Sequence, residues 1–161
     1  MYAAVTKTTL PADSRLNDRV TPGDFLDCYE TRSNMRAPDA AEIIVDFPDW
    51  AQWLVGVRNA LTAPFGLLKD GPEGVEKIGA FPIEYSSDQE VIAGFNDKHL
   101  EFRVSVGSAE GKVWLATWVQ THNLGGRLYL CGIMPFHILI ARNALARVAR
   151  ATGPDRPARA I

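Results

Sequence analysis

A change of hydrophobic period near Ile78 constrains this chain more than any other feature. Before it, apolar residues recur at helical spacing, whereas after it they alternate with polar residues, as half-buried strands do. The segments predicted to be strands are 25–30, 78–86, 90–96, 98–107, 112–122 and 126–134. Only short turns separate the last five, and such turns join antiparallel neighbours, because parallel strands need a crossover of about a dozen residues. We therefore expect an antiparallel meander.

Three helices are predicted around this sheet. Two short helices follow the first strand: one is introduced by Asp39 and Glu42 and ends before Pro48, and the next spans about 49–61. A long helix is predicted over 135–151, since its apolar residues recur every four positions. A sheet with one apolar face must be covered, and only these helices are available. The sequence thus predicts an α+β fold in which a strongly curved antiparallel sheet wraps around a long C-terminal helix.

Length and charge limit the organisation and the partners. The chain has 161 residues, which is typical of one domain. We expect a flexible N-terminal arm over 1–22, a single domain over 23–152 and a flexible tail over 153–161. The net charge is −2 and the isoelectric point is about 5.9, values that argue against general nucleic-acid binding.

Membrane and redox signals are weak in this sequence. The most apolar run, 131–141, is interrupted by Pro135 and His137, so no membrane span is predicted. The N-terminus lacks a basic start followed by an apolar stretch, so no signal peptide is predicted. The two cysteines, Cys28 and Cys131, lack the spacing of a metal knuckle or a redox pair. We expect a reduced, cytoplasmic protein.

The strand predicted over 98–107 alternates cleanly between polar and apolar residues. A turn at 108–111 would place Glu101 opposite Trp118, and a turn at 123–126 would pair His122 with Arg127. One face then collects the polar and aromatic residues His99, Glu101, Arg103, Trp118, Gln120, His122, Arg127 and Tyr129. The other face collects Leu100, Phe102, Val104, Leu115, Val119, Leu128 and Leu130, which we assign to the core.

The polar face has two interpretations. It is either the solvated outer surface of the sheet or the lining of a ligand cavity or protein interface. Under the second interpretation, His137 at the start of the long helix joins the candidate ligand-binding residues. A metal site from His99, Glu101 and His122 lacks any recognised ligand spacing, so no metal is predicted. No hydrolase or dinucleotide-binding signature is present, so we assign no catalytic residue and expect no cofactor.

Two extended segments resemble the central signature of domain-of-unknown-function family 2867. They are 97–106 and 121–130, the latter continuing through Ile133, Pro135, Phe136 and His137. Pro48-Asp49-Trp50 with Arg58, and then Phe81-Pro82, resemble the N-terminal half of that family. The resemblance covers roughly residues 24–150. It implies a START-like or Bet v 1-like helix-grip domain (the SRPBCC superfamily), which usually has seven strands, about one more than predicted.

The resemblance names no function, but the wider superfamily includes lipid carriers, hormone receptors, cyclases and hydrolases. We expect a domain that binds a small hydrophobic or amphipathic molecule. One alternative is a cyclase-, aromatase- or hydrolase-like enzyme acting on a hydrophobic carbonyl compound, with a His or Glu as general base and Arg103 or Tyr129 polarising the oxygen. Another is an oligomerising module whose Trp-bearing sheet face pairs with a second copy in a homodimer.

Overall fold

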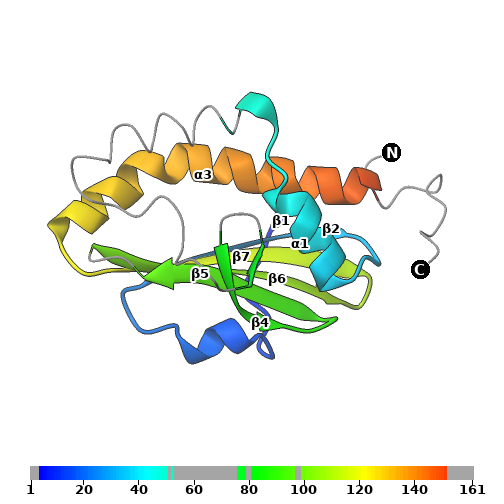
Figure 1. Cartoon of the computed structure of the whole chain (residues 1–161), viewed down its shortest axis with the longest axis horizontal. Helices are drawn as coiled ribbons and strands as arrows, with labels where there is room; N and C mark the ends of the chain where they lie inside the picture. Colours follow the sequence, from blue (N-terminus) through cyan, green and yellow to red (C-terminus); the bar gives the residue numbers. More distant parts are fainter. Residues whose placement is uncertain (1–3, 51, 53–75, 79–80, 97–98, 152–161) are drawn as a thin grey trace.

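Seven antiparallel strands form one curved sheet beneath a long helix in the computed structural model, which describes residues 4–50, 52, 76–78, 81–96 and 99–151 (Figure 1). The strands are β1 (Thr6–Lys7), β2 (Phe25–Arg32), β3 (Lys77–Ile78), β4 (Phe81–Ser86), β5 (Glu90–Asn96), β6 (Leu100–Ala109) and β7 (Lys112–Thr121). Their order across the sheet is β1-β2-β7-β6-β5-β4-β3. The meander β4 to β7 is therefore confirmed, and β2 pairs with β7 to extend it.

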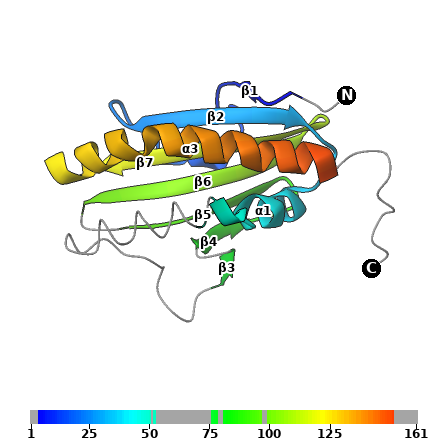
Figure 2. The same ribbon diagram turned by 90° about the horizontal axis from the view of Figure 1, so that it is seen from above.

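Two α-helices of the described residues lie on one face of this sheet, which we call the inner face. Helix α1 (Ala37–Val45) follows β2, and helix α3 (Leu124–Ala151) runs along the sheet beside it (Figure 2). The second short helix, predicted over about 49–61, lies almost entirely outside the described residues, as does the predicted tail. The predicted α+β class, with a curved sheet and a long C-terminal helix, is confirmed.

The strand predicted over 126–134 is wrong, because these residues form the first part of α3. The Asn123 side chain accepts a hydrogen bond from the Gly126 amide at 2.9 Å and so caps the helix at its start. A Cβ atom at Gly126 would lie 2.3 Å from the His99 carbonyl oxygen, so only glycine allows this close approach to the strand. Pro135, predicted to open the helix, lies inside it. The Asn-Leu-Gly-Gly segment thus starts a helix rather than closing a hairpin.

The hairpin between β6 and β7 closes more tightly than predicted. Glu110 and Gly111, both at positive φ, form a two-residue turn, so Arg103 rather than Glu101 lies opposite Trp118. This register differs from the predicted one by two positions. Because side chains alternate with a period of two, the predicted division of these strands into a polar and an apolar face survives the shift.

The main core lies between the inner face and the second half of α3. It joins small residues of the two helices to aliphatic residues of the sheet: Ala37, Ala40, Ala41, Ala141, Ala144, Leu145, Val148, Val106, Val113 and Leu115. Arg147 of α3 also donates hydrogen bonds to the carbonyl oxygens of Ile43 and Ile44, at 2.6 and 3.3 Å. A cation at these last carbonyls complements the negative end of α1 and ties the two helices together.

The outer face is covered by the N-terminal segment. The sequence predicted a flexible arm over 1–22, but Thr6–Lys7 pairs with β2 at the sheet edge, and Leu16 in the 3-10 helix η1 (Arg15–Asp18) is completely buried against the outer face. It packs in a second cluster with Cys28, Ile92, Trp114 and other outer-face residues. The buried Glu90 carboxylate accepts hydrogen bonds from the hydroxyl groups of Ser14 and Ser105. These contacts explain why a polar segment is held in place.

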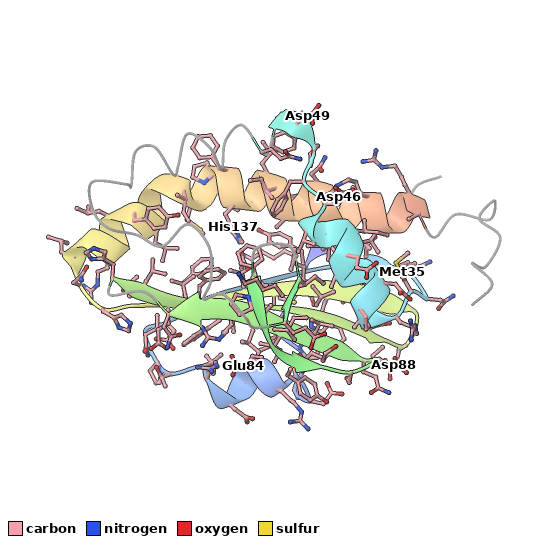
Figure 3. All side chains as sticks on the ribbon, viewed as in Figure 1. Met35, Asp46, Asp49, Glu84, Asp88 and His137 are labelled. Atoms are coloured by element: carbon pink, nitrogen blue, oxygen red, sulfur yellow. The ribbon has the colours of Figure 1, made fainter. Side chains whose placement is uncertain are left out.

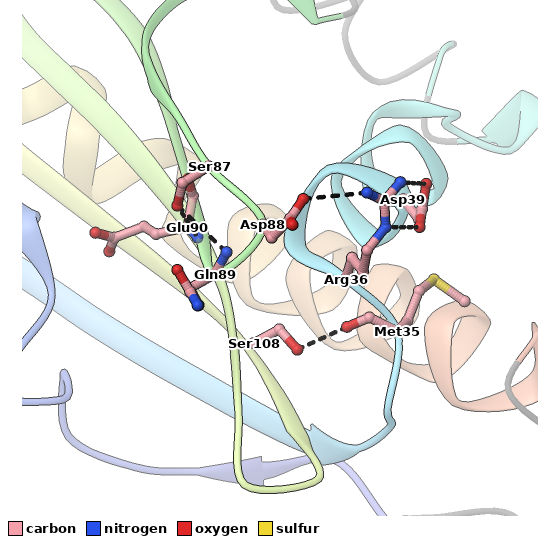
Figure 4. A network of polar contacts seen from close by, with 8 residues as sticks. All are labelled: Met35, Arg36, Asp39, Ser87, Asp88, Gln89, Glu90 and Ser108. Carbon is pink, nitrogen blue, oxygen red and sulfur yellow. Dashed lines mark hydrogen bonds and ion pairs between the residues drawn. The ribbon is translucent and has the colours of Figure 1, made fainter.

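Polar contacts also attach the start of α1 to the sheet (Figure 4). The Arg36 guanidinium bridges Asp39 in the first turn of α1 and Asp88 in the β4–β5 turn, each at 3.1 Å. The Ser108 hydroxyl donates to the Met35 carbonyl oxygen at 2.7 Å. Helix α1 is therefore held at both ends. It does not cover the part of the inner face that lies under the first half of α3.

Candidate functional site

The structure does not bring the predicted polar set together in a cavity. Arg103 and Trp118 lie on the outer face, opposite to the side on which α3 packs, and Glu101 shares that face because it alternates with Arg103. His122 lies 3.8 Å from Glu101, and His99 contacts Asn123. The remaining predicted residues are elsewhere: Arg127, Tyr129 and His137 all belong to α3.

Arg103 serves an outer-face network. Its guanidinium donates to Glu84, to the Asn96 side chain at 2.9 Å and to its neighbouring carbonyl. Glu84 also pairs with Arg19 of the N-terminal segment. Partial burial alone would raise the pKa of Glu84, but the hydrogen bonds from Arg19 and Arg103 lower it below its ordinary value. Arg103 thus fixes the N-terminal segment to the sheet.

Trp118 also attaches the N-terminal segment to the sheet. Its indole N–H donates to the Asp24 carboxylate at 2.8 Å, and the Arg19 guanidinium lies over its ring at 5.9 Å. Gln120 donates to the same carboxylate at 3.3 Å. These partners use the polar groups of Trp118 and Gln120 within the protein, which supports a structural role for this part of the outer face.

The inner face carries a different polar group, formed by Asp27 and His137. Strand alternation directs Asp27 of β2 towards α3, together with its neighbours Phe25 and Tyr29. Nε2 of His137 lies 2.9 Å from Oδ2 of Asp27, and the Phe25 ring meets the imidazole edge-on with 6.1 Å between ring centroids. His137 lies between α3 and the sheet (Figure 3). Of the predicted site residues, it alone lies on the inner side near a buried acid.

The second carboxylate oxygen of Asp27 is the unusual feature. The Asp27 side chain is 7% exposed, yet its Oδ1 atom has no hydrogen-bond partner among the described residues. A buried acceptor left unpaired costs about 1–3 kcal/mol of folding free energy. Thr117, also buried, lies directly opposite Asp27 in the neighbouring strand. The inner face therefore holds a carboxylate that can accept a further hydrogen bond.

The surroundings of Asp27 are buried enough to shift neighbouring groups. Burial, reinforced by the Asp27 carboxylate, raises the pKa of the Tyr29 hydroxyl above its ordinary value. Burial, again reinforced by Asp27, raises the pKa of the Cys28 thiol to about 12. Both shifts disfavour a second negative charge beside Asp27.

The packing between α3 and the sheet differs along the helix. In the second half, the inward residues Ala144 and Val148 are buried, whereas in the first half Leu130 and Ile133 keep part of their surface exposed, as does Ile140 just beyond it. On the facing inner side of the sheet, Phe25, Phe102, Val104 and Ile83 are also only half-buried. Apolar side chains on two facing surfaces thus remain partly accessible around the Asp27–His137 pair. This combination is typical of a small-molecule site.

Metal binding finds no support in the described part of the chain. No group of three His, Cys, Asp or Glu side chains there is placed to hold a metal ion. His122 and Glu101 approach each other, but His99 is turned to Asn123 at the start of α3. His99, Glu101 and His122 therefore make two separate contacts and do not form a three-ligand cluster.

Sequence reasoning missed Asp27. The strand predicted over 25–30 contained it, and its alternation with Phe25 and Tyr29 placed an acid on the same face as two aromatic rings. That juxtaposition was the available signal. His137 was included as the first polar residue of a predicted helix, and its contact with Asp27 depends on a strand 110 positions earlier in the chain.

Comparison with known proteins gives a family but no activity. The sequence profile of the family described as "Protein of unknown function (DUF2867)" matches residues 20–144. Among solved structures, CalU16 from Micromonospora echinospora is similar over 93% of this chain and 96% of its own, at 12% identity and a TM-score of 0.27. No curated protein matches.

Replacing the inner pair tests whether it serves stability. His137→Leu should lower the free energy of unfolding by about 3 kcal/mol, because it leaves the buried Asp27 carboxylate without its partner. Asp27→Leu combined with His137→Leu should restore at least the wild-type value, since neither member of the pair is then left unpaired. Urea unfolding followed by tryptophan fluorescence measures both. A double variant as unstable as His137→Leu would mean that the fold itself requires the pair.

Proposed function

The chain belongs to the DUF2867 family of proteins of unknown function, and we propose that it binds a small, largely apolar molecule between the sheet and the first half of α3. The observation that carries this proposal is the buried, unpartnered Oδ1 atom of Asp27. A protein that retains such an atom loses stability unless something else pairs with it. A ligand with a hydroxyl or N–H group supplies the missing donor.

The surroundings define the rest of the ligand. The half-buried residues around Asp27 are aliphatic or aromatic: Phe25, Phe102, Val104, Leu130, Ile133 and Ile140. A ligand that covers them gains the free energy of removing their apolar surface from water. The proposed ligand is therefore a hydrophobic ring or chain with one hydrogen-bond donor. Kinship with START-like ligand carriers is part of the proposal, and the covered sheet and long C-terminal helix are in keeping with it.

Two matched probes test the proposed donor. 2-Naphthol carries a hydroxyl group, whereas 2-methoxynaphthalene has the same ring system without a donor. A hydrogen bond to a charged acceptor contributes about 1.5–3 kcal/mol, so the protein should bind the naphthol at least about tenfold more tightly. Equilibrium dialysis of each probe measures the two dissociation constants.

Variants assign that preference to one atom. Asp27→Leu should bring the two dissociation constants close to parity, because it removes the acceptor and keeps a similar volume. Glu101→Leu is the matched control, since it removes a carboxylate from the outer face and should leave the preference unchanged. The proposal is rejected if neither probe binds, or if Asp27→Leu retains the wild-type preference.

The geometry of the pair favours one second candidate, a proton-transfer enzyme. An ionised carboxylate only accepts hydrogen bonds, so a neutral His137 facing Oδ2 must carry its proton on Nε2. Its Nδ1 atom then holds a free electron pair and can act as a base, oriented by Asp27. The expected substrate is a hydrophobic carbonyl compound, from whose α-carbon Nδ1 takes a proton to leave an enolate. Arg103, one of the two predicted polarising groups, lies on the other face and cannot take part, whereas the other, Tyr129, belongs to α3.

Isotope exchange separates catalysis from binding. In D2O the protein should speed the replacement of the α-hydrogens of 1-tetralone by deuterium, followed by proton NMR. His137→Gln should slow this exchange at least about a hundredfold and leave 1-tetralone affinity within a few fold, because the amide still donates to Asp27. His122→Gln on the outer face is the control. Binding of 1-tetralone without accelerated exchange would remove the enzyme candidate and leave the binding function standing.

A further inference from the structure

The exposed side of α3 is as apolar as its buried side. Leu124, Leu128 and Leu139 are 69%, 65% and 55% exposed, and Phe136 and Ile138 are also among the exposed large apolar residues. Leu124, Leu128, Cys131, Pro135 and Ile138 follow one another at steps of four and three, so they line one side of the helix. We call this set, with Leu139, the apolar stripe. A monomeric soluble protein rarely leaves such a continuous apolar surface in water.

The charged residues of α3 are all positive. Its 28 residues include four arginines, at positions 127, 142, 147 and 150, and no Asp or Glu. The chain as a whole has more acidic than basic residues, so this helix departs from the rest of the molecule. Arg127 is exposed near the start of the apolar stripe, and Arg142 is exposed near its end, where its guanidinium also donates to the Val5 carbonyl oxygen at 3.2 Å and lies over the Tyr29 ring. A partner that fits this surface has to be apolar and negatively charged.

We propose that the apolar stripe docks on an anionic lipid surface, with α3 parallel to the bilayer plane. An exposed helix with Leu and Ile on one side and arginine as its only charged residue type has the properties of an interfacial helix. Asp49 lies above α3, on the side away from the sheet (Figure 3), and its chain neighbour Trp50 is 39% exposed. Indole rings favour the boundary between headgroups and acyl chains, so Trp50 adds to the proposed contact.

Charge favours lipid over a second copy of the chain. Two α3 helices packed along the apolar stripe would bring arginines together with no acidic residue on either helix to pair with them. Anionic headgroups supply that negative charge, and acyl chains cover the leucines.

The packing of α3 favours a helix that lies on the membrane surface over one that spans the membrane. By length and composition alone α3 could span a bilayer, since an 18-residue window has a mean hydropathy of 1.4 and only 11% of it is buried. However, Ala141, Ala144, Leu145 and Val148 in the second half are packed against the sheet and α1. A folded domain can therefore offer only the outward side of α3 to lipid.

Vesicle co-sedimentation tests this proposal. The protein should sediment with vesicles of equimolar phosphatidylcholine and phosphatidylglycerol, and less with phosphatidylcholine alone. Leu124→Glu combined with Leu128→Glu should reduce the partition coefficient at least about tenfold, because both leucines enter the lipid. Thr9→Glu combined with Ala12→Glu adds the same charge at exposed positions of the N-terminal segment and should bind like the wild type. Both sites are exposed, so circular dichroism should show intact folds.

Cys131 provides a second readout on the apolar stripe itself. It is exposed, whereas Cys28 is 1% exposed with its thiol pKa raised to about 12, so a thiol reagent should label Cys131 selectively. An environment-sensitive dye there should shift to shorter wavelengths when the mixed vesicles are added. The proposal is overturned if the wild type stays in the supernatant, or if both double variants sediment equally. It is also overturned if light scattering shows a dimer that Leu124→Glu with Leu128→Glu dissociates and that binds no vesicles.

Discussion

The contact between the second half of α3 and the inner face of the sheet determines the rest of this structure. Alanines at 141 and 144, with those of α1 at 37, 40 and 41, let both helices pack closely against valines and leucines of the strands. The inward residues Leu130, Ile133 and His137 of the first half are larger than these alanines. Dense packing at one end and partial exposure at the other therefore follow from side-chain size along a single helix. This gradient gives the domain a rigid end and an end that can accept a ligand.

The change in packing density along α3 explains the role of Asp27. In the densely packed end, a carboxylate with one unpaired oxygen would be a simple loss of stability. Beside His137, at the boundary of the partly exposed end, the same oxygen is an acceptor that a ligand can reach. The buried indole N–H of Trp114 on the outer face is also unpaired, but only Asp27 lies beside a histidine and partly exposed apolar side chains, which is why this pair is the candidate site. The outer-face ion pairs are satisfied within the protein and hold the N-terminal segment.

Much of the fold could be predicted because period-two alternation and short turns depend on local sequence. The two-residue error in the β6–β7 register did no harm, since an even shift preserves which face Arg103 and Trp118 occupy. The first part of α3 was mistaken for a strand because Gly125 and Gly126 fit a hairpin turn equally well. What decides between the two is the close approach of Gly126 to the His99 carbonyl, a contact that the sequence does not show.

The candidate site was harder to predict for the same reason. The outer-face set shared a face by alternation, but alternation does not say which face the helix covers. The Asp27–His137 contact joins β2 to α3, two elements that are far apart in the sequence. Only the topology of the whole domain brings these two residues together. Sequence reasoning thus reached His137 alone.

A crystal structure with 6-bromo-2-naphthol tests the central claim most directly, because the anomalous signal of bromine locates the ligand. The account predicts the ring system between the inner face and the first half of α3, with its hydroxyl group within hydrogen-bond distance of Asp27 Oδ1. A ligand seated instead in the hollow beside η1 on the outer face, lined by Arg15, Arg19 and Tyr85, with Asp27 Oδ1 bonded to a protein group, would contradict it.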